Sequence, residues 1–233
     1  MAEFLIDNQV IHYEIIGTLD KQRTPILMLH GNGENMHCFD DVISRFTDSK
    51  DFVLMDSRLQ GESHPVNGGS IELSFERMAD DAIALMKHLG IREYYVVGYS
   101  DGGIVALMMA MKTYDVMKII AIGVNSTPDG LTSGAIRRIK AAYRKAKRQH
   151  NEVGMALNRL MLEEPHITLR DLSRIVAEVT ILLGQKDNMI DAKQSEAIAD
   201  ALPHCSHVII AGAGHDIPNT HAAQLADYIR TLL

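Results

Sequence analysis

The sequence predicts an α/β fold: a mostly parallel central sheet with helices on both faces, preceded by an N-terminal antiparallel hairpin. Short apolar runs typical of buried strands alternate with longer segments of helical periodicity along the 233 residues. Glycine-rich or polar loops follow several of these runs, and one such loop carries a serine between glycines. A chain of this length buries a sizeable core, so we expect residues 1–233 to form one domain.

Composition narrows the class of protein. The net charge of −7 and the isoelectric point of about 5.8 argue against general nucleic-acid binding. No apolar run approaches the roughly 20 residues of a membrane span, and the first residues do not resemble a secretory signal. The two cysteines, Cys38 and Cys205, lack the spacing of metal ligands. We therefore expect a cytoplasmic protein with reduced thiols and with no nucleic-acid or membrane partner.

The N-terminal half is expected to alternate strands and helices. Residues 4–6 and 10–16 flank a two-residue turn as a hairpin does, and the apolar runs 26–29 and 52–55 have the character of buried parallel strands. A helix is expected to end near Phe46. Apolar residues then recur at helical spacing to residue 89, with Ser74 placed to cap the helix N-terminus.

The C-terminal half continues this alternation with one interruption. We expect strands at 94–97, 119–124, 179–183 and 207–210, and helices at about 104–110, 192–202 and 221–233. Residues 126–175 break the alternation, because they contain two helical patterns without a convincing strand between them. Ligands bind beyond the carboxyl ends of parallel strands, so the loops after the strands are where functional residues are expected.

One of these loops has the pattern of a nucleophile elbow. The strand at 94–97 leads into Gly98-Tyr99-Ser100-Asp101-Gly102, and an apolar helical run follows. A serine on so tight a strand-to-helix turn has a strained backbone, and the glycines allow the strand and the helix to approach. An ordinary glycine-rich turn would give the same pattern, so this stretch alone does not decide the function.

Two further residues complete a candidate triad. A serine nucleophile needs a base within hydrogen-bond distance, and the base needs a group that orients it. Asp187 and His215 each follow an expected strand. Taken singly, one is explained as a turn carboxylate and the other as a loop histidine bonded to backbone. Together, the chain order Ser100, Asp187, His215 is that of the elbow-type hydrolases and predicts a catalytic triad.

An oxyanion hole is expected from backbone N–H groups. The N–H of Asp101 follows the nucleophile, and that of Asn32 lies in the glycine-rich loop after the strand at 26–29. The place of Asp101 at a helix N-terminus also explains its carboxylate without a function. This chemistry requires no metal and no organic cofactor.

The motifs resemble those of the α/β-hydrolase family over nearly the full chain. His30 and Gly31 are similar to its oxyanion motif, and residues 56–63 are similar to its D-x-R-G-x-G-x-S loop, with Leu59 in place of the usual glycine. Some members of the family keep the acid at the position of Asn125, so the resemblance implies that Asp187 is the acid here. It also implies a small, esterase-like serine hydrolase in which residues 126–175 form a short helical lid inserted into the domain, beside a relatively open pocket.

The lid carries an unusual charge. Its first helix is strongly basic and also has an apolar stripe; the basic residues are Arg137, Arg138, Lys140, Arg144, Lys145, Lys147 and Arg148. This indicates an amphipathic helix with a solvated face, with attraction of an anionic substrate or partner as the alternative. His37 and His64 are placed on loops near the expected mouth, where a surface position is favoured over substrate contact.

We expect a serine hydrolase that cleaves a small to medium carboxylic ester, a small-molecule substrate, through an acyl-enzyme. The same residues suit three other enzymes: a C–C bond hydrolase, a lactonase and an acyltransferase. From another class, a slow-turnover ligand-binding or regulatory protein of the same fold remains open, as does a homo-oligomer.

Overall fold

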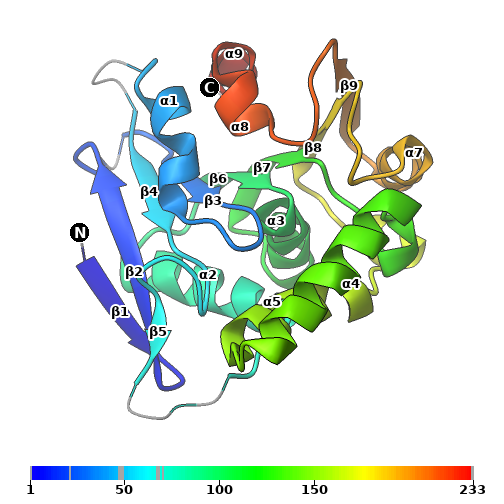
Figure 1. The fold of residues 1–233 in the computed structure, drawn as a ribbon. Coiled ribbons are helices and arrows are strands. Elements are labelled where there is room, and N and C mark those ends of the chain that lie inside the picture. The colour runs from blue at the N-terminus through cyan, green and yellow to red at the C-terminus, as the bar shows by residue number, and fades with distance from the viewer. Residues whose placement is uncertain (1, 21, 47–49, 67–68, 70, 232–233) are drawn as a thin grey trace.

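A mostly parallel, nine-stranded sheet forms the centre of the described part of the chain (Figure 1). The computed structural model describes residues 2–20, 22–46, 50–66, 69 and 71–231. The strand order is β1-β2-β4-β3-β6-β7-β8-β9, with β5 paired to β2; β1, β2 and β5 are antiparallel to their neighbours and the other pairs are parallel. The strands are β1 Ala2–Ile6, β2 Gln9–Ile16, β3 Ile26–Leu29, β4 Phe52–Met55, β5 His64–Pro65, β6 Tyr94–Tyr99, β7 Val116–Ile122, β8 Glu178–Gly184 and β9 Cys205–Ile210.

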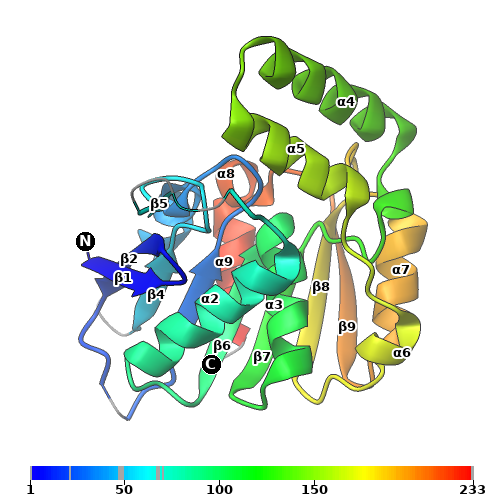
Figure 2. The same ribbon diagram turned by 90° about the horizontal axis from the view of Figure 1, so that it is seen from below.

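Helices cover both faces of this sheet. In Figure 2, α2 and α3 lie on one face of the sheet, α8 and α9 lie behind it, and α4 and α5 lie beyond one end of the strands. The helices are α1 Asp40–Ile43, α2 Phe75–His88, α3 Asp101–Lys112, α4 Ser133–Arg148, α5 Glu152–Glu163, α6 Leu169–Leu172, α7 Ala192–Ala201, α8 Ile217–Thr220 and α9 Ala222–Thr231, with short 3-10 helices at η1 Met36–Phe39 and η2 Pro128–Gly130. None of these helices is long and apolar enough to cross a membrane.

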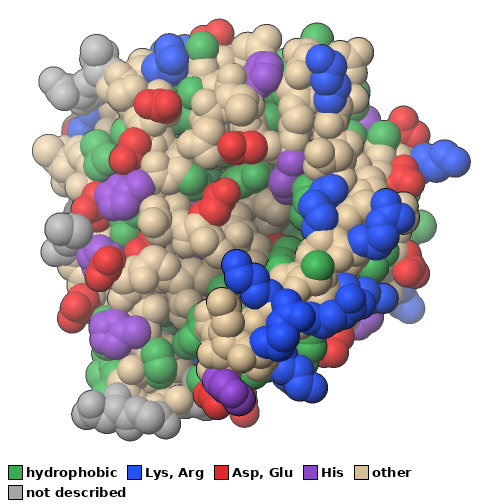
Figure 3. Space-filling view, in the orientation of Figure 1, with side chains coloured by type: hydrophobic (Ala, Val, Ile, Leu, Met, Phe, Trp, Pro, Cys, Tyr) green, Lys and Arg blue, Asp and Glu red, His purple; other side chains and the backbone are tan. Residues whose placement is uncertain are grey.

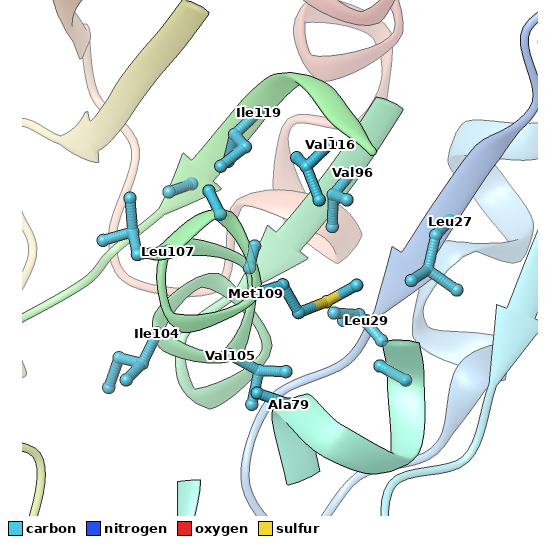
Figure 4. Close-up of a cluster of buried hydrophobic side chains, with 14 of the residues drawn as sticks. Leu27, Leu29, Ala79, Val96, Ile104, Val105, Leu107, Met109, Val116 and Ile119 are labelled. Carbon is cyan, nitrogen blue, oxygen red and sulfur yellow. The ribbon is translucent and has the colours of Figure 1, made fainter. Parts of the chain in front are cut away.

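The alternation of side chains along the strands produces two cores. Leu27 and Leu29 of β3 point to the α2 and α3 face, where they join one apolar cluster (Figure 4). Ile26 and Met28 point to the other face, where they join a cluster with residues of α1 and α9. All four side chains are fully buried, which explains why β3 is a continuous apolar run rather than an alternating one.

The predicted fold class is confirmed, including the antiparallel hairpin of β1 and β2. The Ser74 cap is also confirmed, because its side chain accepts a hydrogen bond from the backbone N–H of Arg77. The strand β5 was missed: it is only two residues long and places His64 opposite Val10, so His64 lies in a strand rather than a loop.

Three helices differ from expectation. The helix expected to end near Phe46 consists of η1 followed by a four-residue α1 that ends at Ile43. The last helix is preceded by a separate turn, α8, and its expected final residues, 232 and 233, lie outside the described residues. The inserted segment holds a third helix, α6, which a capping box between Thr168 and Asp171 stabilises. Helices of four residues are too short to show a periodic apolar pattern.

Leu59, which stands where the family motif has glycine, adopts a backbone conformation that favours glycine. Its φ is +65°, in the left-handed region that favours glycine. A left-handed residue with a Cβ costs roughly 1–2 kcal/mol. The Leu59 side chain is buried, which contributes roughly 1.5–3 kcal/mol and offsets that strain. Burial of its side chain therefore explains how Leu59 tolerates a backbone conformation that glycine adopts more easily.

Candidate active site

The turn between β6 and α3 holds Ser100 in a strained backbone conformation, with φ +53° and ψ −117°. Close approach of the backbone explains the flanking glycines. A Cβ on Gly98 would lie 2.2 Å from the carbonyl oxygen of Gly102, and a Cβ on Gly102 would lie 2.1 Å from that of Leu29. The N–H of Ser100 donates to the carbonyl of Ile122 in β7, at 2.7 Å. The elbow is thus fixed by backbone contacts on several sides.

The structure brings Ser100, His215 and Asp187 into one hydrogen-bonded chain. The Nε2 atom of His215 is 3.1 Å from the Oγ of Ser100, and its Nδ1 atom is 2.8 Å from Oδ2 of Asp187. A carboxylate only accepts hydrogen bonds, so Nδ1 carries the proton and Nε2 is free to accept one from the serine hydroxyl. This is the arrangement that a general base requires.

The loops after β8 and β9 hold the acid and the base in place. The second carboxylate oxygen of Asp187 accepts hydrogen bonds from the backbone N–H groups of Met189 and Ile190, at 2.7 and 2.9 Å. The Tyr99 ring packs against the imidazole of His215, with 5.3 Å between the centroids. The orientation of both side chains therefore depends on three strands that are distant in sequence.

The two expected oxyanion donors lie on the two segments that flank Ser100. Within the described part of the chain, no protein group accepts a hydrogen bond from the backbone N–H of Asn32 or of Asp101. The imidazole of His30 holds the Asn32 loop: Nε2 accepts from the N–H of Ser57, so Nδ1 donates to the carbonyl of Gly31. Burial lowers the pKa of His30, which favours this neutral form.

The side chains of Asn32 and Asp101 are also joined, which sequence reasoning missed. The Nδ2 atom of Asn32 donates to Oδ2 of Asp101 at 2.7 Å and lies 3.3 Å from the carbonyl oxygen of Leu157 in α5. Asp101 is buried, and burial raises its pKa to about 6; the Asn32 bond and His215 lower the pKa, while Glu34 and Glu164 raise it. Only the packing of β3 against α3 brings these two positions together, so no local pattern signals the pair.

A small cavity lies beside Ser100. Its volume is about 10 Å³, close to what one water molecule needs. Its lining includes Ser100, Asp101 and His215 and, from residues 126–175, Leu131, Met161 and Glu164. Glu164, next to the end of α5, also accepts a hydrogen bond from the N–H of Phe75. The relatively open pocket stays a prediction. A larger hollow of about 330 Å³ between α2 and α5 shares Glu164 as a lining residue.

The remaining candidates lie apart from the triad. The seven basic residues of α4 are exposed and gather on one side of the molecule (Figure 3). His37 is exposed and contacts Asp40, and burial raises the pKa of both cysteine thiols, which disfavours them as nucleophiles. Among the described residues, no group of three His, Cys, Asp or Glu side chains is placed to hold a metal ion.

Comparison with known proteins identifies the family. Residues 24–141 match the family described as alpha/beta hydrolase fold, and the chain belongs to it. A proline iminopeptidase from Clostridioides difficile is 27% identical over 101 residues, which are 43% of this chain but only 34% of that relative. The chain thus spans about a third of that relative's length.

Two solved structures resemble the whole chain in fold. A thermophilic esterase from Thermogutta terrifontis has a TM-score of 0.78 at 22% identity and is covered to 98%, with all of this chain matched. Est816, an enzyme that degrades N-acyl homoserine lactones, has a TM-score of 0.79 at 18% identity, with both chains fully covered. At these identities the likeness to the two solved structures establishes the fold alone.

Proposed function

We propose that this protein is a serine hydrolase that cleaves small to medium carboxylic esters through an acyl-enzyme intermediate. The observation that carries the proposal is the continuous hydrogen-bonded chain Ser100–His215–Asp187. Beside it lie the N–H groups of Asn32 and Asp101, which donate to no group of the described residues. The solved structures of the same fold include an esterase and a lactone-degrading enzyme, which is why esters are proposed as the substrates.

In the proposed reaction, the Oγ of Ser100 attacks the ester carbonyl while Nε2 of His215 takes its proton. Asp187 accepts the hydrogen bond from Nδ1–H of His215 and stabilises the imidazolium. The N–H groups of Asn32 and Asp101 donate to the oxyanion of the tetrahedral intermediate. Collapse breaks the bond to the alkoxy oxygen, and the alcohol leaves with the proton from His215. Water, deprotonated by His215, then attacks the acyl-serine and releases the acid.

The ester carbonyl is proposed to bind beside Ser100, in the cavity that Ser100, His215 and Glu164 line. The hollow of about 330 Å³ on the other side of Glu164 offers room for one end of a small or medium substrate.

The test is turnover of p-nitrophenyl esters of increasing acyl length by the wild type, Ser100→Ala and Ser206→Ala. Ser206 is an exposed serine of β9 and is the matched control. We expect hydrolysis by the wild type and by Ser206→Ala, and loss of at least about 10³-fold in Ser100→Ala with folding retained. Turnover by Ser100→Ala at the wild-type rate would refute the proposed mechanism.

A further inference from the structure

We infer that the side chain of Asp101 is a positioning residue, which fixes the oxyanion loop by holding the side-chain amide of Asn32. The inference rests on the proposed function, because it concerns the two N–H groups expected to bind the oxyanion. It assigns the side chains a role separate from that of the backbone.

The first step of the argument is the geometry of the link. Asn32 lies on the loop after β3, and Asp101 begins α3, so a single bond of 2.7 Å joins the two segments that supply the donors. The bond has a carboxylate as acceptor, and charge-assisted bonds are about twice as strong as neutral ones. A displacement of one donor by about 1 Å is enough to lower an enzymatic rate by about 10²-fold. A strong bond between the donor segments therefore has a direct effect on the rate.

The second step concerns the lid. The same Nδ2 atom makes a longer contact, 3.3 Å, with the carbonyl of Leu157 in α5. The bond to Asp101 is shorter and does not involve α5, so it holds Asn32 independently of that helix.

The third step is burial. Asp101 is 3% exposed, and the ionisable groups that face it are His215, Glu34 and Glu164. Two of these three are carboxylates, so ionising the buried Asp101 costs free energy. The hydrogen bond from the side-chain amide of Asn32 offsets part of that cost. A carboxylate retained in such a position, beside the nucleophile, fits a role in positioning better than a role in stability.

The test combines kinetics of five variants on p-nitrophenyl acetate with their melting temperatures. Asp101→Leu and Asn32→Leu each remove the link and should lower kcat by about 10- to 100-fold with KM changed less than about threefold. The double variant should be no slower than the slower single variant by more than about threefold, because both changes break the same bond. Asp101→Asn keeps an acceptor for Nδ2 and should lose at most about threefold. Asn158→Leu, which removes a comparable amide bond within α5, is the matched control and should stay within about twofold.

A second readout does not depend on turnover. In the resting protein, the side-chain NH₂ signals of Asn32, identified by their absence in Asn32→Leu, should shift with a midpoint near pH 6 in the wild type. They should not shift with this midpoint in Asp101→Asn, whereas any effect of His215 is common to both proteins. This readout also covers the case in which Asp101→Leu does not fold.

The results separate the two proposals. An active wild type with multiplicative losses in the double variant, or with Asp101→Asn as slow as Asp101→Leu, overturns the inference. Identical pH responses of the Asn32 signals in the wild type and in Asp101→Asn also overturn it. A wild type that neither hydrolyses esters nor reacts with a fluorophosphonate at Ser100 overturns the proposed function instead.

Discussion

Replacing Gly102 by alanine tests whether close backbone approach holds the elbow together. The added Cβ would lie 2.1 Å from the carbonyl oxygen of Leu29, 2.5 Å from its carbon and 2.7 Å from the carbonyl oxygen of His30. Non-bonded heavy atoms prefer separations of about 3.5–4.0 Å, so α3 and β3 must move apart by about 1 Å or more. Backbone atoms cannot rotate away, so we expect the upper end of the usual overpacking cost, about 3 kcal/mol.

That cost can be measured by thermal unfolding. In a chain of this size, 1 kcal/mol lowers Tm by about 2–4 °C, so Gly102→Ala should lower it by about 6–12 °C. Gly90→Ala is the control: Gly90 has φ +73° at the end of α2, but a Cβ there would meet nothing within 4 Å. Its cost is roughly 1–2 kcal/mol, or about 2–8 °C. An equal decrease in the two variants, or no decrease in Gly102→Ala, would refute the reasoning.

Three further predictions concern single side chains. Asp187→Asn should lower kcat by about 10⁴-fold. The amide oxygen of the new asparagine stays with the two backbone N–H groups, so its NH₂ group faces Nδ1 of His215 and forces the imidazole proton to Nε2. Ester turnover near the wild-type rate would contradict this. Asp81→Asn should destabilise the fold by about 3–5 kcal/mol, because it removes the charged partner of the buried Arg58. The two side chains form an ion pair with two hydrogen bonds, at 2.6 and 2.8 Å. Urea unfolding measures the loss, and a loss below about 1 kcal/mol would speak against the prediction. Burial raises the pKa of Asp101 to about 6. Between about pH 4 and 6 the folded state therefore binds more protons than the unfolded state. The stability of the wild type should fall by up to about 3 kcal/mol as the pH rises through this range. The gain in stability of Asp101→Asn over the wild type should therefore grow across this range, and a constant difference would show that Asp101 does not titrate there.

Much of the fold and of the candidate triad could be predicted because the signals are local. Buried strands such as β3 and β4 are apolar on both faces, and the glycines around Ser100 mark a tight turn whatever the rest of the chain does. Short elements such as β5 and α6 could not be predicted, since two to four residues carry no period. The link between Asn32 and Asp101 could not be predicted either, because it depends on how β3 packs against α3.

The sequence by itself determined the α/β class, the elbow and the order of Ser100, Asp187 and His215, because each depends on residues that are neighbours along the chain. Only the tertiary structure decided that these three side chains meet at hydrogen-bond distance and that Asn32 donates to Asp101, 69 residues away. It also decided which side chains line the small cavity beside the serine, among them Met161 of α5 and Phe75 of α2. The physical reason is that such contacts form between the ends of different strands, whose separation is fixed by the packing of the whole sheet.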